Sequence, residues 1–147
     1  MNRRNFIRSS CYTCVGSLGL ITILEACTSQ KYINNYVLNN NTLTVRKSEF
    51  TAVNKKTPTE LPFVMLKPEQ SPFPIALYKD GDSNYNALFM QCTHQGCELN
   101  PYELMIVCPC HGAEFNTKGE VTQGPAEINL KSFITTHDHE NIYIQLS

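Results

Sequence analysis

Two short segments hold the side chains of this sequence that are best suited to bind a metal. Residues 92–97 read Cys-Thr-His-Gln-Gly-Cys, and residues 108–115 read Cys-Pro-Cys-His-Gly-Ala-Glu-Phe. Thiolate and imidazole ligands together suit zinc or iron. A Cys-x-His beside a Cys-x-x-His supplies two sulfur and two nitrogen ligands, enough for one tetrahedral zinc or for a two-iron cluster with mixed ligands.

The two segments together hold four cysteines and two histidines, which are more ligands than one zinc ion takes. In an exported chain, thiols that lie close together without a metal oxidise to a disulfide. The residue types therefore predict a metal centre, a disulfide or both, and they leave zinc and iron open.

The two segments resemble the boxes C-T-H-x-G-C and C-P-C-H-G of the Rieske [2Fe–2S] family at every fixed position. We name them box one (residues 92–97) and box two (residues 108–112). The resemblance covers about residues 42–147 and implies one [2Fe–2S] cluster, with two cysteines on one iron and two histidines on the other. The ligands that it implies are Cys92, Cys108, His94 and His111.

The resemblance also implies a disulfide that joins the two boxes, between Cys97 and Cys110, as in the exported members of the family. It further implies that a third, proline-containing loop covers the cluster. The residues that it places around the cluster are Gln95, Gly96, Gly112, Ala113, Phe115, Gly124 and Pro125.

Two of these surrounding residues depart from the family members that oxidise ubiquinol. Those members usually carry a Ser after the glycine of box two and a Tyr two positions later, and both hydroxyls donate hydrogen bonds to sulfur. Ala113 and Phe115 stand at these positions and have no hydroxyl, and Gln95 replaces a leucine that often shields the cluster. We therefore expect a lower reduction potential, suited to a menaquinol-linked or other low-potential chain.

The N-terminal residues 1–26 have the layout of an export signal. Basic residues precede an uncharged stretch, residues 9–24, that is too short to cross a bilayer as a helix. The Arg3-Arg4 pair with its following Phe-Ile is similar to a twin-arginine signal. Leu-Glu-Ala-Cys, which ends at Cys27, resembles a lipobox apart from its glutamate, so Cys27 is a candidate for lipidation. The alternatives are an uncleaved membrane anchor and simple cleavage, and all three place the folded part outside the cytoplasm.

The elements that must position the two boxes are predicted to be strands. Residues 27–41 are polar and Asn-rich and predict a tether, with a first strand or short helix around residues 32–38 as the alternative. From residue 42 onward, short apolar runs alternate with Pro and Gly, and no window has a convincing helical period. The predicted fold is all-β: a small antiparallel Rieske-type β-sandwich of about eight to ten strands, with a cluster-binding subdomain of two hairpin loops.

The length and charge of the chain exclude several functions. With 147 residues, it has room for one domain and a tail but not for the additional large domain of a Rieske oxygenase. Its 12 basic and 13 acidic residues nearly balance, so there is no electrostatic argument for binding nucleic acid.

The sequence thus predicts a one-electron carrier rather than an enzyme by itself. We expect it on the extracytoplasmic face of a bacterial cell envelope, in a quinol-linked or periplasmic redox chain. Its partners would be redox proteins, together with the membrane through a lipid or an N-terminal anchor. The alternatives are a small electron-transfer subunit of a periplasmic oxidoreductase and a zinc-stabilised binding module without redox activity.

Overall fold

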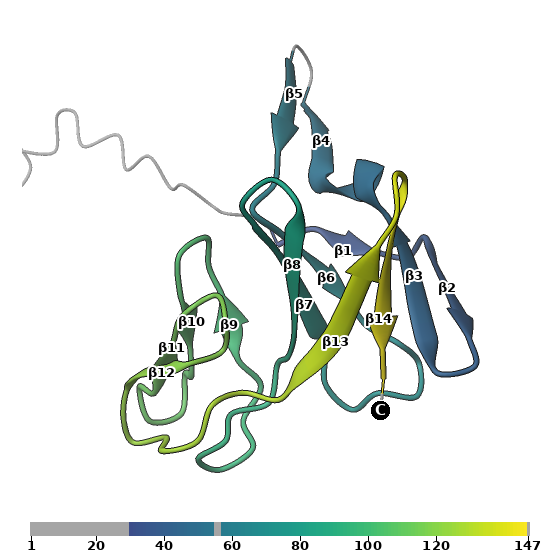
Figure 1. The fold of residues 1–147 in the computed structure, drawn as a ribbon. Coiled ribbons are helices and arrows are strands. Elements are labelled where there is room, and N and C mark those ends of the chain that lie inside the picture. Colours follow the sequence, from purple (N-terminus) through teal and green to yellow (C-terminus); the bar gives the residue numbers. More distant parts are fainter. Residues whose placement is uncertain (1–29, 55–56, 147) are drawn as a thin grey trace, which may run out of the picture.

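The computed structural model describes residues 30–54 and 57–146, which form strands and loops around two cores (Figure 1). The predicted export signal and Cys27 lie outside the described residues. Within this described part of the chain, no helix has the length and apolar character that crossing a bilayer requires. The prediction of an all-β fold is confirmed.

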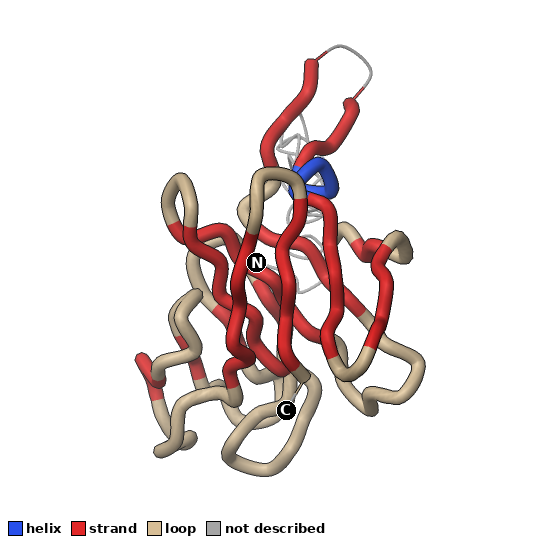
Figure 2. Tube along the Cα trace, turned by 45° about the vertical axis from the view of Figure 1, so that its right-hand side comes forward, coloured by secondary structure: helices blue, strands red, loops and turns tan. Residues whose placement is uncertain are grey.

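The largest sheet has eight strands in the order β1-β6-β7-β8-β13-β14-β3-β2. Neighbouring strands run antiparallel except β1 and β6, which run parallel. Figure 2 shows strands lying side by side in a curved sheet. The strands are β1 (Tyr32–Ile33), β2 (Tyr36–Asn39), β3 (Thr42–Arg46), β6 (Phe63–Leu66), β7 (Ile75–Asp80), β8 (Asn84–Phe89), β13 (Ser132–His137) and β14 (Asn141–Gln145).

A second sheet of four short strands carries the two boxes, in the order β12-β11-β10-β9. Its neighbouring strands are all antiparallel. In Figure 1 this sheet lies to one side of the large sheet, next to β8. The strands are β9 (Asn100–Pro101), β10 (Ile106–Val107), β11 (Glu114–Phe115) and β12 (Val121–Gln123).

The remaining elements are a short 3-10 helix, η1 (Lys47–Phe50), and a hairpin of β4 (Thr51–Asn54) and β5 (Thr57–Glu60). The hairpin extends away from the two larger sheets in both views (Figures 1 and 2).

Strands β6, β7 and β8 separate the two cores of the molecule. Successive side chains of a strand point to opposite faces, and in β6 the residues Phe63 and Met65 belong to one core while Val64 and Leu66 belong to the other. All four are buried, which explains why residues 63–66 form an unbroken apolar run rather than an alternating one.

The core on the outer face of these strands is shared with the four-stranded sheet. It contains Met90, Leu99, Ile106 and Phe115 from the segments around the boxes. The hydroxyl of Tyr78, in β7, donates a hydrogen bond to the Tyr102 carbonyl at 2.9 Å and joins the two sheets. The four-stranded sheet is therefore held against the large sheet by both apolar packing and this hydrogen bond.

The first described residues differ from the tether predicted over residues 27–41. Residues 32–39 form β1 and β2, and the Ile33 side chain is only 3% exposed in the core of the large sheet. Asn40 and Asn41 both have positive φ and form the turn between β2 and β3. Asparagine tolerates this backbone conformation, so an Asn-rich stretch that predicts a tether also suits a hairpin turn. The alternative prediction, strand structure around residues 32–38, agrees with β1 and β2.

Candidate metal centre

Boxes one and two are loops of the four-stranded sheet and of the segment that leads into it. Box one lies between β8 and β9, and box two lies between β10 and β11. Antiparallel pairing of β10 with both β9 and β11 brings the two loops to the same end of the sheet.

The two loops have the same backbone hydrogen bonds. In box one, the Cys92 N–H donates to the Cys97 carbonyl at 2.8 Å and the Gly96 N–H donates to the Cys92 carbonyl at 2.8 Å. In box two, the corresponding bonds run from the Cys108 N–H to the Ala113 carbonyl and from the Gly112 N–H to the Cys108 carbonyl. Each loop therefore turns tightly around its first cysteine.

Gly96 and Gly112 make these turns possible. Their φ angles are 75° and 73°, which a residue with a Cβ adopts only at a cost. The glycines in the Gly-Cys part of box one and in the His-Gly part of box two thus have a structural role in these loops.

The first cysteines of the two boxes lie together under the loops. Cys92 and Cys108 are free and buried, and their thiols are close enough to form a hydrogen bond. The pKa of the Cys92 thiol is raised, chiefly by burial and further by the neighbouring Cys108. The backbone N–H groups of His94 and Gln95 act in the opposite direction and lower it. Those two N–H groups are donors that stabilise negative charge on sulfur.

The two histidines lie together at the surface. The ring centroids of His94 and His111 are 5.2 Å apart, and the ring planes are nearly perpendicular at 89°. Both side chains are exposed. The site therefore offers a pair of buried thiols and a pair of exposed imidazoles, and this donor set suits a two-iron cluster with mixed ligation.

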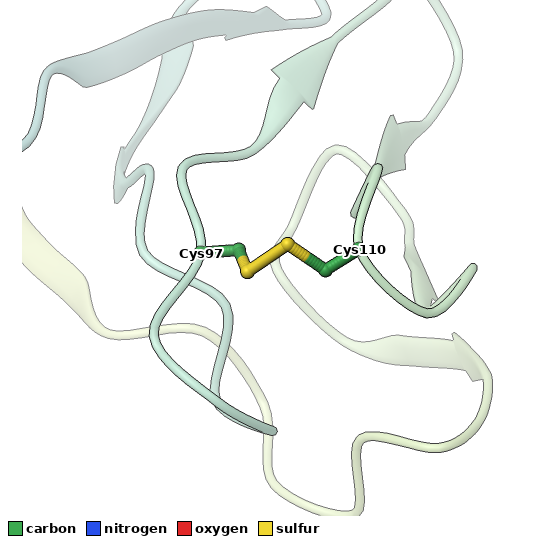
Figure 3. The surroundings of a disulfide bond; sticks show 2 residues. All are labelled: Cys97 and Cys110. Carbon is green, nitrogen blue, oxygen red and sulfur yellow. A yellow bond between two sulfur atoms is a disulfide. The ribbon is translucent and has the colours of Figure 1, made fainter.

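A disulfide joins the two boxes. Cys97 at the end of box one and Cys110 inside box two are bonded, with their Cα atoms 6.6 Å apart. Figure 3 shows the bond running between two separate loops. The Sγ atoms of Cys97, Cys108 and Cys110 lie within 4.8 Å of one another. Two of these three sulfurs are already bonded to each other, so this group is not a set of three free metal ligands.

The remaining residues expected around the centre differ in burial. Ala113 and Phe115 are fully buried and bring no hydroxyl to the site. Gln95 and the Gly124-Pro125 pair are exposed, and the pair begins the loop of residues 124–131 between β12 and β13, which we name the third loop.

Two contacts of the third loop and its preceding strand were not expected from the sequence. The Thr93 hydroxyl donates to the Ile128 carbonyl at 2.6 Å and ties box one to the third loop. The Gln123 side-chain amide donates to the Gly112 carbonyl at 2.9 Å and ties β12 to box two. Because the partners are 35 and 11 positions apart in sequence, no local pattern predicts either contact.

We expect the Thr93→Val variant to lose its metal centre faster than the wild-type chain, because valine keeps the shape of threonine but cannot bond to the Ile128 carbonyl. The bond contributes about 1 kcal/mol. The measurement is the rate of bleaching of the visible absorption in the presence of a chelator. Thr93→Ser should restore the slow rate, and the exposed Thr122→Val control should bleach like the wild type. Equal rates for Thr93→Val and the wild type would refute the role of this bond.

Comparison with known proteins places these features in a family. A family model described as Rieske [2Fe-2S] domain matches residues 38–134. Among solved structures, the cyanobacterial plasma membrane Rieske protein PetC3 from Synechocystis PCC 6803 aligns with a TM-score of 0.50 and 32% identity. That alignment covers 56% of this chain and 85% of the other.

Curated relatives match over shorter stretches. The cytochrome b6-f complex iron-sulfur subunit of Prochlorococcus marinus (strain MIT 9303) is 35% identical over 66 residues, which are 44% of this chain and 35% of that protein. The chloroplastic subunit of Oryza sativa subsp. japonica is 46% identical over 41 residues, which are 26% of this chain and 18% of that protein. This chain thus spans little more than a third of the length of the first relative and less than a fifth of the second.

Proposed function

The chain belongs to the Rieske [2Fe-2S] domain family, and we propose that it carries single electrons in a bacterial cell envelope. Its cofactor is one [2Fe–2S] cluster. When bound, such a cluster takes up and releases one electron at a potential well above that of all-cysteine ferredoxins. The proposed ligands are Cys92 and Cys108 for one iron and His94 and His111 for the other.

The observation that carries this proposal is that the two proposed ligand pairs differ in their exposure to solvent. The thiols of Cys92 and Cys108 lie in the core under the loops, and the imidazoles of His94 and His111 lie side by side at the surface. An exposed ligand pair lets a partner protein approach the redox centre directly. A buried pair keeps the other side of the centre away from water.

The chain's own residues prepare the site for added negative charge. The backbone N–H groups of His94 and Gln95 lower the pKa of the Cys92 thiol against the larger effect of burial, which raises it, and N–H groups beside sulfur favour the more reduced, more negative state. Water is excluded from the inner side of the site by the core beneath the boxes, which contains Leu99, Ile106 and Phe115.

The test of the proposed function is metal analysis of the purified full-length chain, together with its visible and EPR spectra. The expected result is two irons per chain and a reversible one-electron reduction. A colourless chain that contains zinc would overturn the proposal and favour a zinc-stabilised binding module.

We expect the Ala113→Ser and Phe115→Tyr variants each to have a higher midpoint potential than the wild type. A new hydroxyl beside sulfur stabilises the reduced state, and a differential of about 1.4 kcal/mol corresponds to about 60 mV for one electron. The measurement is a redox titration followed by EPR. Ala87→Ser and Phe50→Tyr add the same hydroxyls to the other core and should leave the potential unchanged. If the midpoint potentials of the first two variants do not exceed those of these controls, the missing hydroxyls do not lower the potential of the wild type.

A quinol-linked, membrane-bound setting is the second part of the proposal. Its support is that the curated relatives are named as subunits of cytochrome b6-f complexes and that the similar solved structure is titled a plasma membrane Rieske protein. The proposed route to the membrane is export through residues 1–26 and lipidation of Cys27. Co-purification from detergent-solubilised membranes tests whether the partner is a quinol-oxidising complex or a periplasmic oxidoreductase.

The Cys27→Ala variant is expected to move from the membrane fraction to the soluble periplasmic fraction. A chain without the acceptor cysteine cannot receive the lipid that would hold it at the membrane. The measurement is fractionation followed by immunoblotting, with Cys11→Ala as the matched control that stays with the membrane. A Cys27→Ala chain that remains membrane-bound would point to an uncleaved N-terminal anchor.

A further inference from the structure

A free thiol lies next to the disulfide that joins the two boxes. Cys97 and Cys110 are bonded, Cys108 is free, and the sulfur atoms of all three lie within 4.8 Å of one another. Thiol–disulfide exchange requires this arrangement, in which a sulfur nucleophile is held against a disulfide sulfur.

We propose that Cys108, whenever it is not bound to iron, exchanges with the Cys97–Cys110 disulfide. The Cys108 sulfur attacks Cys97 Sγ, so a Cys97–Cys108 bond forms and the Cys97–Cys110 bond breaks. Cys108 gives its proton to water, and the departing Cys110 sulfur takes one up. One disulfide and one thiol are present before and after, and the exchange needs neither an oxidant nor a reductant.

Chain connectivity selects Cys97 as the sulfur that is attacked. A bond between Cys108 and Cys110 would close a very small ring across Pro109, which geometry disfavours. Cys97 and Cys108 are 11 positions apart and Cys97 and Cys110 are 13 apart. The entropy of closing the loop depends weakly on its length, so it favours neither pairing strongly.

The difference in burial favours Cys110 as the sulfur that leaves the disulfide. Its side chain is exposed, whereas Cys108 is buried. The exchange thus places the new disulfide inside the loops and leaves the free thiol in contact with solvent.

The other buried thiol is placed differently. Cys92 contacts Cys108 but does not belong to the group of three close sulfurs. Among the described cysteines, Cys108 is therefore the free thiol that lies against the disulfide, and Cys92 serves as a natural comparison.

The exchange matters for the proposed function because it consumes a proposed iron ligand. The inference rests on Cys108 being a ligand, since iron on its sulfur would prevent the attack. Once Cys108 is bonded to Cys97, the chain lacks one of the four ligands and cannot hold the cluster until the original pairing returns. Loss of the cluster then becomes a covalent change rather than a simple dissociation.

The experiment locates the free thiols in the full chain before and after iron is removed with a chelator under argon. N-ethylmaleimide in acidic denaturant labels free thiols while exchange is stopped, and iodoacetamide labels the rest after reduction. Cleavage after glutamate yields residues 104–114, and fragmentation before Pro109 separates the label on Cys108 from that on Cys110. In the iron-bound chain, N-ethylmaleimide should be found on Cys108 and not on Cys110.

In the iron-free chain, the N-ethylmaleimide label should move from Cys108 to Cys110 in roughly half of the molecules or more. The total number of free thiols should not change. A label that stays on Cys108 after iron removal overturns the proposal.

Two matched variants, each lacking one proposed ligand, complete the test. The Cys92→Ser chain keeps the attacking sulfur and should show the label on Cys110. The Cys108→Ser chain lacks this sulfur and should keep Cys110 in its disulfide. Exposure of Cys110 in Cys108→Ser would show that another thiol attacks and would overturn the proposal. Absence of iron from the purified wild type would instead overturn the proposed function, and the position of the label would still decide on the exchange.

Discussion

The Cys108→Ser variant is expected to purify without its [2Fe–2S] cluster, with iron falling from two atoms per chain to nearly none. Cys108 is buried beside Cys92, and the serine hydroxyl is a much poorer iron ligand than a thiolate. Because a bound metal stabilises only the folded state, the variant should also unfold at a lower temperature. Iron analysis, the visible spectrum and thermal unfolding measure these effects.

A variant in the strand that follows box two, with the proposed ligands intact, is the control for this loss. Glu114→Gln changes a half-buried side chain two positions beyond Gly112 and should purify with a full complement of iron. If Cys108→Ser retains as much iron as Glu114→Gln, then Cys108 is not a ligand, and the assignment of all four ligands must be revised.

The second large effect concerns the disulfide. The Cys97→Ala/Cys110→Ala variant is expected to lose about 3 kcal/mol of stability, because the bond closes a loop whose ends are 13 positions apart. A loss of this size lowers the midpoint of thermal unfolding by on the order of 10 °C. Without this bond the two boxes lose the covalent link between them, so the cluster should also be lost faster during incubation with a chelator.

Reduction of the wild-type chain provides an independent check on the disulfide. Dithiothreitol should lower the unfolding midpoint of the wild type to that of Cys97→Ala/Cys110→Ala and should have no effect on the variant itself. An unfolding midpoint that is the same for the variant and the untreated wild type would mean that the disulfide contributes nothing to the folded state.

The family and the all-β fold could be predicted from the sequence because their signals are local. The two boxes are short, and each contains its cysteine, its histidine and the glycine with positive φ within a few positions. The apolar run of residues 63–66 predicts a buried strand, and it coincides with β6. These features depend on neighbouring residues and need no knowledge of the rest of the chain.

Features that depend on distant residues could not be predicted in this way. Strand β1 exists because Ile33 enters a core built from strands much later in the chain, and its two residues, Tyr32 and Ile33, are too few to show a strand pattern of their own. The bond from Thr93 to the third loop spans 35 positions. The position of Cys108 against the disulfide likewise follows from the pairing of β10 with its neighbours, since the boxes alone do not specify which sulfurs lie closest.

Because the side chains of β6, β7 and β8 point alternately into the two cores, the part of the chain that carries the two boxes has no separate core of its own. Phe63, Ala76 and Leu88 supply one wall of the core beneath the boxes, and the next residue along each of the first two strands supplies the other core. A register slip of one residue would exchange these two faces. The boxes therefore cannot be excised as a miniature electron carrier, because a peptide of residues 91–130 would leave its supporting wall behind.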